Sequence, residues 1–344
     1  MIHIAIGDPQ APFETFLAIL EAHRLLKAGR LRDDVQLVSM GDHFDWGKSE
    51  LRAQATADGV RLLEWLASHS PEQVVIIAGN HDLARVCELQ PFVSDSDFEA
   101  AWALARAAYR DGDVDEALEA QFLEKYPHVP DAECIARDFS CFSVRQRELV
   151  TSLLKTKRLR LAHEHAGLLL VHAGITNEET EDRHAKSLAA SLNRFLDERV
   201  ERWTSGPLDL TPLHQPGSAA GGEARGIFFH RPAQPTSSNT HQFAGPPRRR
   251  FDPRTLPSDF PQAIGHIRDK KARELLGTAW ADATPARDGV IRSLSVEGEN
   301  VRYRHGAHAD ARLYFLDCGM SHVAPESYEL FDLDARATVR VRTG

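Results

Sequence analysis

The chain has 344 residues, of which 42% are hydrophobic and 26% are charged, and it contains 22 glycines and 18 prolines. This composition excludes collagen-like and wholly disordered chains and indicates an ordinary globular protein. Lysine and arginine number 41 against 50 aspartate and glutamate residues, so the net charge of −9 argues against a generally cationic surface for binding nucleic acid.

The cysteines and the apolar segments indicate the cellular compartment. The four cysteines, Cys87, Cys134, Cys141 and Cys318, form no CxxC pair. Their spacing favours reduced thiols over a disulfide scaffold or a zinc ribbon. No apolar run reaches the ~18–20 residues that span a bilayer, and the N-terminus lacks the pattern of a signal peptide. We therefore expect a cytoplasmic protein that does not insert into a membrane.

Strands and helices alternate in the first 80 residues. Short apolar strands are predicted at Ile2–Ile6, Val35–Met40 and Val74–Ile77, with helices over Phe13–Lys27 and around Val60–Leu66 between them. This alternation is typical of βαβ units and of a parallel sheet that is buried on both faces. Each of the three strands ends in glycine followed by aspartate or asparagine. In open α/β sheets the chemistry collects beyond the carboxyl ends of the strands.

The rest of the chain is less regular. A helical, charged stretch from about 95 to 157 predicts an inserted helical cap, and a strand at Leu168–Val171 and a helix over Ser187–Trp203 follow it. Residues 205–261 are rich in proline, glycine and serine and predict a long irregular loop. Further strands are expected at Gln262–Gly265, Gly289–Val296, Leu313–Leu316, Tyr328–Leu333 and Thr338–Val341, the last four of them antiparallel. We treat residues 1–344 as a single α/β domain that carries the cap and the loop as additions.

Polar side chains gather where the predicted strands end, at Asp8, Gln10, Asp42, Asp45, Asn80, His81, His172 and His266. Carboxylate, amide and imidazole donors together suit a pair of divalent cations such as Mn, Fe, Zn, Co or Ni. A carboxylate shared by two such ions holds them ~3.5–4 Å apart, a spacing that clamps a phosphoryl group. Aspartate and asparagine are also favoured helix N-caps, so a purely structural role is the alternative for any one of these positions taken alone.

Five short motifs occur in the order found in one enzyme family. They are Gly7-Asp8, Gly41-Asp42-His43-Phe44-Asp45, Gly79-Asn80-His81-Asp82, Val171-His172-Ala173-Gly174 and Gly265-His266. The chain resembles the metallophosphoesterases (calcineurin-like phosphoesterases), and its last two motifs are most similar to the phosphoprotein-phosphatase branch and its bacterial relatives. The resemblance implies a four-layer α/β/β/α sandwich.

The resemblance also implies a role for each polar residue. Two divalent ions are expected, with Mn²⁺ as the first expectation and Fe, Zn, Co or Ni as alternatives. The implied ligands are Asp8 and Gln10 on the first ion, Asp42 bridging, and Asn80, His172 and His266 on the second. His81 is implied as the general acid or a phosphate contact, oriented by Asp45. A carboxylate beside an imidazole independently favours the protonated ring and fixes its orientation.

The chain departs from the family pattern at the metal site and at the phosphate contacts. Gln10 stands where the family usually has histidine, and its neutral amide predicts a loosely held ion or one of harder character. The family's phosphate-binding arginines are replaced by Trp46 and Ala78. Because bidentate guanidinium contacts suit a phosphomonoester dianion, another arginine is expected in their place.

Arg231, in the segment Phe228–Pro232, is the first choice for this arginine, with Arg85 and Arg268 as alternatives. Arg268 also stands where many other members of the superfamily carry a further histidine ligand. The basic triplet Arg248-Arg249-Arg250 is more typical of a solvated loop than of an anion site.

These features predict a binuclear metal-dependent phosphoesterase in which a metal-bridging hydroxide attacks phosphorus. A phosphomonoesterase acting on a phosphoprotein or a small phosphorylated molecule is the first hypothesis. A phosphodiesterase or nucleotide pyrophosphohydrolase is the second, and a non-catalytic phospho-ligand or protein-binding module with a degenerate metal site is the third. The expected partner is a phosphorylated substrate rather than nucleic acid or a membrane, and the oligomeric state stays open.

Overall fold

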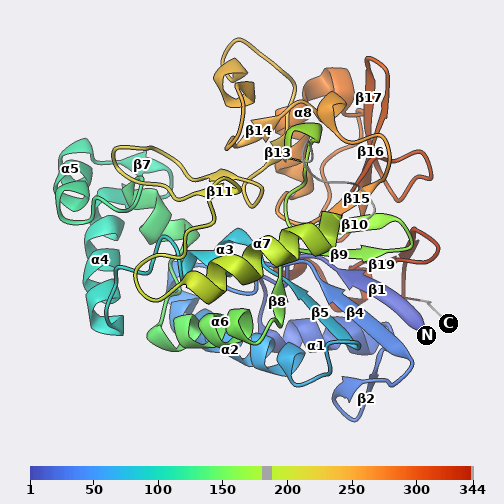
Figure 1. Ribbon diagram of the computed structural model, residues 1–344, viewed down its shortest axis with the longest axis horizontal. Coiled ribbons are helices and arrows are strands. Elements are labelled where there is room, and N and C mark those ends of the chain that lie inside the picture. Colours follow the sequence, from blue (N-terminus) through green and yellow to red (C-terminus); the bar gives the residue numbers. More distant parts are fainter. Residues whose placement is uncertain (180–187, 342–344) are drawn as a thin grey trace.

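A computed structural model describes residues 1–179 and 188–341, and two six-stranded sheets form its centre (Figure 1). The first sheet has the strand order β20 (Ala337–Val339), β19 (Leu330–Asp332), β1 (Ile2–Ile6), β4 (Val35–Ser39), β5 (Val74–Ile77) and β8 (Leu159–Arg160). Strands β1, β4, β5 and β8 are parallel, whereas β19 and β20 pair antiparallel. The βαβ arrangement predicted for the first 80 residues is therefore confirmed.

The second sheet is also mixed. Its strand order is β17 (Asn300–His305), β16 (Arg292–Glu297), β18 (Leu313–Phe315), β15 (Gln262–Ile264), β10 (Leu168–Val171) and β9 (Ala162–His165). Strands β10, β15 and β18 are parallel, and β9, β16 and β17 pair antiparallel. The antiparallel pairing predicted for the C-terminal strands holds for β16, β19 and β20, whereas β18 is also parallel to β15.

The two sheets contact each other through apolar and aromatic side chains. The rings of Tyr314 in β18 and Phe331 in β19 lie 4.9 Å apart, and both are buried. The carboxyl end of β1 approaches the end of β18 so closely that a Cβ added at Gly7 would lie 1.7 Å from the carbonyl oxygen of Leu316. Only glycine fits there. This close approach brings the strand ends of both sheets to one place.

Eight helices lie within the described residues. They are α1 (Phe13–Ala22), α2 (Arg52–Ala67), α3 (Asn80–Ala84), α4 (Asp95–Ala108), α5 (Glu116–Lys125), α6 (Val144–Lys155), α7 (Leu188–Arg202) and α8 (Asp269–Trp280). Helices α2 and α6 contact strands of the first sheet, while α7 and α8 contact strands of the second. The predicted α/β class with helices packed on two sheets is confirmed, and the order of the four layers stays a prediction.

The stretch predicted as a helical cap has two parts. Helices α4 and α5 contact each other, are joined by the hairpin β6 (Tyr109–Arg110) and β7 (Asp113–Val114), and project at the left of Figure 1. Helix α6 instead contacts α2, α7 and β8, so it lies with the helices beside the sheets. The extent of the single domain and of its insert stays a prediction.

The 205–261 stretch has more order than its composition suggested. It contains the antiparallel pair β11 (His214–Gln215) and β12 (Arg225–Gly226) and the parallel pair β13 (Arg231–Pro232) and β14 (Arg250–Phe251). Large apolar side chains of this stretch, Phe228 and Phe251 among them, are buried in the main core. It is therefore packed onto the sheets.

The helix predicted over Phe13–Lys27 is shorter than expected. Helix α1 ends at Ala22, Arg24 takes a φ of 59°, and the chain turns into the hairpin β2 (Leu26–Lys27) and β3 (Arg30–Leu31). The first residue of the helix predicted over 187–203 lies outside the described residues.

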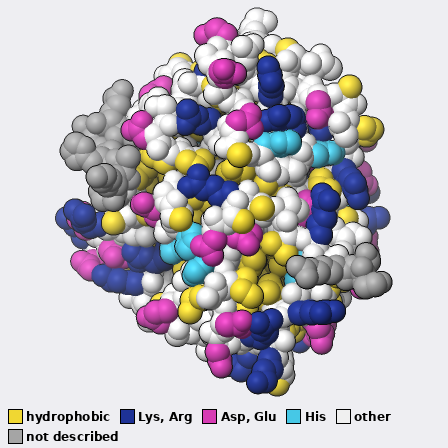
Figure 2. Space-filling model, turned by 90° about the vertical axis from the view of Figure 1, so that its right-hand side faces the viewer, with side chains coloured by type: hydrophobic (Ala, Val, Ile, Leu, Met, Phe, Trp, Pro, Cys, Tyr) yellow, Lys and Arg dark blue, Asp and Glu magenta, His cyan; other side chains and the backbone are white. Residues whose placement is uncertain are grey.

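No described helix combines the length and the apolar character needed to cross a membrane. Figure 2 shows the face at the right of Figure 1, where basic and acidic side chains are intermixed with apolar ones.

Candidate active site

The carboxyl ends of the strands open into a cleft of about 440 Å³. Seven of the nine predicted site residues line it: Asp8, Gln10, Asp42, Asn80, His81, Arg231 and His266. The other two lie directly beneath, because His172 approaches Asp42 and Asp45 contacts His81. The structure thus brings together all nine residues, which come from the ends of β1, β4, β5, β10 and β15 and from β13.

Three of these residues have an unusual backbone conformation. Asp42, Asp45 and His266 have φ angles of 58°, 61° and 64°, in the left-handed region that side chains other than glycine rarely adopt. Such conformations cost of order 1–3 kcal/mol each and collect at functional sites. Gly79 makes room for Asp42, since a Cβ at Gly79 would lie 2.1 Å from Asp42 Oδ1.

Asp82 holds the turn after β4 in this conformation. Its fully buried carboxylate accepts hydrogen bonds from the backbone N–H groups of Asp42, His43 and Gly79, at 3.0, 3.1 and 2.8 Å. The His43 ring is also buried, with Nδ1 3.0 Å from Asp82 and Nε2 2.9 Å from Ser39 Oγ. The sequence suggested only packing or solvent contact for His43 and gave no role to Asp82, although Asp82 lies inside a recognised motif.

Asp42, His172 and His266 form a group that is suited to a metal ion. One ligand atom from each lies within 4.8 Å of the others. His172 Nδ1 is 2.8 Å from the carbonyl oxygen of Met40, which can only accept a hydrogen bond, so Nδ1 carries the proton. His172 Nε2 faces Asn80 Oδ1, 3.0 Å away, and Asp42 Oδ2, 3.4 Å away. Burial lowers the pKa of His172, but the Asp42 carboxylate outweighs it and raises the pKa above its usual value. A cation held between these three atoms would take the place of the proton on Nε2.

Two buried ligand atoms of this site, Asp8 Oδ1 and His266 Nε2, have no hydrogen-bond partner among the residues that the structure describes. Burial, with Asp317 and Asp42 close by, raises the pKa of Asp8 well above its usual range. Burial and the neighbouring Arg231 lower the pKa of His266 well below its usual value, so its ring is neutral and can donate a lone pair. Unpartnered buried groups of this kind are costly, and divalent cations would offset that cost.

The amide of Gln10 also fits a ligand role. Gln10 Nε2 donates a hydrogen bond to the carbonyl oxygen of Phe44 at 3.2 Å. This bond fixes the orientation of the amide and leaves Oε1 as the atom that is available to a cation. The donor set therefore fits divalent metal ions, with four oxygen donors and two imidazoles.

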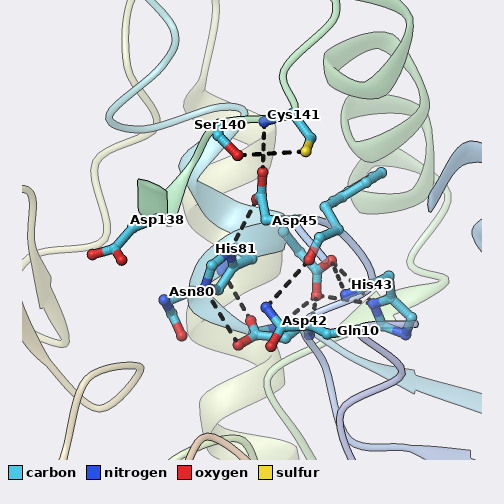
Figure 3. Close-up of polar contacts among 12 residues, drawn as sticks. Gln10, Asp42, His43, Asp45, Asn80, His81, Asp138, Ser140 and Cys141 are labelled. Carbon is cyan, nitrogen blue, oxygen red and sulfur yellow. Dashed lines mark hydrogen bonds and ion pairs between the residues drawn. The ribbon is translucent and has the colours of Figure 1, made fainter. Parts of the chain in front are cut away.

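His81 is held by a chain of contacts through Asp45 (Figure 3). His81 Nδ1 lies 2.9 Å from Asp45 Oδ2, and Asp45 in turn pairs with Arg85 at 2.6 Å and accepts a hydrogen bond from the Cys141 N–H at 2.8 Å. Burial lowers the pKa of His81, but the carboxylates of Asp42 and Asp45 outweigh it and raise the pKa above its usual value. Arg85 is fully buried, so it acts on Asp45 and does not reach the cleft as a phosphate contact.

Arg231 is the first residue of β13 and stands opposite Arg250 of β14. Within the described residues its guanidinium makes no ion pair, and its Nε is buried without a hydrogen-bond partner. Burial and the nearby Arg249 lower the pKa of Arg231 to about 10. An unpaired cation in such a place is suited to an anionic ligand.

Further basic side chains line the same cleft: Arg137, Arg249, Arg250, Arg268 and Lys271. The sequence marked the Arg248–Arg250 triplet as a solvated loop, but two of its members face the site, whereas Arg248 pairs with Glu178 and Glu179. The alternative phosphate contact Arg268 is paired with Asp288 at 2.8 Å. Asp317 also lines the cleft, from the segment directly after β18.

Comparisons with known proteins identify the family of the chain. Residues 3–227 match the family model described as calcineurin-like phosphoesterase. A solved cold-active protein tyrosine phosphatase is 14% identical, with 95% of this chain and 72% of that chain covered and a TM-score of 0.41. Another, from a psychrophilic Shewanella species, is 12% identical, with 99% and 80% covered and a TM-score of 0.43. No curated protein matches. On the match over residues 3–227, the chain belongs to the calcineurin-like phosphoesterase family.

Proposed function

We propose that this phosphoesterase is a binuclear metal-dependent phosphomonoesterase that acts on a phosphorylated small molecule or phosphoprotein. The observation that carries the proposal is the pairing of two opposite features in one cleft. Unpartnered carboxylate and imidazole atoms of Asp8 and His266 form its floor, and the unpaired Arg231 stands beside them. The floor suits cations and the arginine suits a phosphate.

The residues that would hold two divalent ions are Asp8, Gln10, Asp42, Asn80, His172 and His266. When bound, such ions neutralise phosphoryl charge and activate water for in-line attack. The backbone of this site is fixed before any ion binds, because Asp82 holds the turn that carries Asp42. Oxygen and imidazole donors together suit Mn²⁺, with Fe, Zn, Co and Ni as alternatives.

His81 supplies the proton that the leaving oxygen needs. Its Nδ1 is engaged by Asp45, so Nε2 is the atom that faces the cleft and carries the transferable proton. Burial lowers the pKa of His81, but the carboxylates of Asp42 and Asp45 raise it above its usual value, which favours the protonated ring that a general acid requires. Asp45 orients the ring and does not itself contact the substrate.

The basic residues favour a monoester over a diester. A phosphomonoester is a dianion, and Arg231 and Arg250 supply positive charge that the residues at positions 46 and 78 do not. Arg249 also lines the cleft but pairs with Glu223 at 3.3 Å. A singly charged diester requires fewer such contacts. This charge is the reason for placing phosphodiesterase or pyrophosphohydrolase activity second.

The test is a comparison of kcat/KM on an aryl phosphomonoester and on the matching diester. The enzyme is purified without chelator and reconstituted with Mn²⁺, and Asp42→Asn serves as the inactive control. We expect about two Mn²⁺ per chain and a clear preference for the monoester. A preference for the diester would overturn the monoesterase assignment, and the absence of bound Mn²⁺ would favour a non-catalytic binding module.

A further inference from the structure

A second group of potential metal ligands lies outside the cleft. Cys87 and Glu88 follow α3, and His214 begins β11. One ligand atom from each lies within 4.8 Å of the others, and all three residues are buried, with 1%, 3% and 2% of their surface exposed. None of them belongs to the motifs that built the active site, and none lines its cleft.

Three polar atoms of this group lack a hydrogen-bond partner within the described residues, namely Glu88 Oε1 and both ring nitrogens of His214. His214 Nε2 lies 3.1 Å from Glu88 Oε1, within ion-pair distance. The thiol of Cys87 donates a 3.4 Å hydrogen bond to the carbonyl oxygen of Leu208. Buried polar atoms without partners cost ~1–3 kcal/mol each, so a group of them in one place indicates a ligand.

The orientation of the His214 ring is set by its aromatic neighbours. It stacks on Phe229, with ring centres 5.6 Å apart and planes at 15°, and meets the edge of Phe228 at 5.7 Å. The ring therefore holds its nitrogen toward Glu88 without help from a hydrogen bond. A side chain fixed in this way is prepared to bind an ion.

We propose that Cys87, Glu88 and His214 form a buried zinc site that is separate from the active site. A thiolate, a carboxylate and an imidazole are the donor types that Zn²⁺ takes in proteins, and three of them leave one position for water. The charges balance, because one thiolate and one carboxylate neutralise one divalent ion. A neutral complex is the form that a buried position tolerates best.

The site would tie two parts of the active site together. Cys87 and Glu88 lie just beyond the short helix that starts with Asn80, and His214 lies in the segment that leads to Phe229 and Arg231. Phe229 also meets the ring of His266 edge-on at 6.2 Å. Zinc at this position would therefore fix the Arg231 segment against the helix that carries His81.

Cobalt spectroscopy separates this site from the active site. The chelator-treated full-length chain is titrated with Co²⁺ under reducing conditions, and the thiolate-to-cobalt charge-transfer band is followed in the near ultraviolet. The ligands proposed for the active site are oxygen and imidazole only, so they give no such band. Burial and Glu88 raise the pKa of the Cys87 thiol well above its usual range, and a bound cation would favour the thiolate.

We expect a band of one equivalent in the wild type that Zn²⁺ removes by competition. Cys87→Ser should lose it, whereas Asp42→Asn and the buried-cysteine control Cys318→Ser should keep it. Glu88→Gln keeps the thiolate and should weaken Co²⁺ binding at least ~10-fold. The absence of a band in the wild type overturns the proposal, as does a band that persists in Cys87→Ser. Neither result depends on phosphatase activity.

Discussion

Replacement of Arg231 by methionine should raise stability while it removes activity. The guanidinium is largely buried, has no acidic partner within the described residues, and its pKa is lowered to about 10 by burial and by Arg249. The folded protein thus holds this cation at a cost that only a bound anion offsets. Methionine has a similar length and no charge, so it fills the same space without that cost.

The expected sizes of the stability and activity changes follow from the burial and the charge of Arg231. A pKa lowered from 12.5 to about 10 corresponds to an unfavourable free energy on the order of 3 kcal/mol, and partial exposure of the side chain reduces it to ~1–2 kcal/mol. The loss of one bidentate phosphate contact removes two charge-assisted hydrogen bonds of ~1.5–3 kcal/mol each. We therefore expect Arg231→Met to raise Tm by a few degrees and to lower kcat/KM on an aryl monoester by ~10²-fold or more.

The assay pairs thermal unfolding of the metal-reconstituted enzyme with steady-state kinetics. The matched control is Arg304→Met, because Arg304 is also partly buried but pairs with Asp310 at 2.9 Å and lies outside the cleft. It should leave kcat/KM unchanged and should not raise Tm. The reasoning about Arg231 is refuted by wild-type kinetics in Arg231→Met, or by a Tm that falls as far as that of a core cavity variant.

Four further changes test other residues of the site. His81→Ala should lower kcat ~10²–10⁴-fold with metal content intact, and Asp45→Asn should move the basic limb of the pH profile to lower pH, because His81 loses the carboxylate that raises its pKa. Asp42→Asn should abolish turnover and release both proposed ions, as measured by elemental analysis. Asp82→Ala leaves three backbone N–H groups unpaired and should cost ~3–5 kcal/mol of unfolding free energy in denaturant titrations. Loss of metal in His81→Ala, or normal stability in Asp82→Ala, would contradict these roles.

The sequence predicted best the strands that consist of consecutive buried apolar residues. Strands β5 and β10 have the predicted bounds, since four consecutive apolar residues followed within three positions by a glycine leave little choice. Strands β8 and β9 were not predicted, because β8 has two residues and β9 reads Ala-His-Glu-His, without an apolar alternation. Strand β17 does alternate, with Val301 and Tyr303 buried, and that pattern was available in the sequence.

The residues of the candidate site also differ in how well the sequence could predict them. Asp8, Asp42, Asn80 and His266 could be predicted because each follows a recognisable strand and a glycine, and His172 because it directly follows such a strand. The basic residues could not be placed, because Arg249 and Arg250 reach the cleft only through the pairing of β13 with β14. That pairing joins segments of two residues each, which carry no periodic signal. The Cys87, Glu88 and His214 group was missed for a related reason, since His214 is distant in sequence and the cysteines form no spaced pair.

The cleft combines proposed metal ligands with basic residues, and these two groups come from different parts of the chain. Its acidic floor follows the strands of both sheets, and the match to the family covers most of it but ends at residue 227. Its basic rim, from Arg231 to Lys271, lies beyond that match. The floor suits cations and the rim suits the anionic substrate, so substitutions in the two groups should have different effects. Variants of the proposed metal ligands should lose metal. Variants of the rim residues should keep metal and change the preference between monoester and diester. The long segment after α7 is thus the part of this chain that we expect to determine which phosphate ester it hydrolyses.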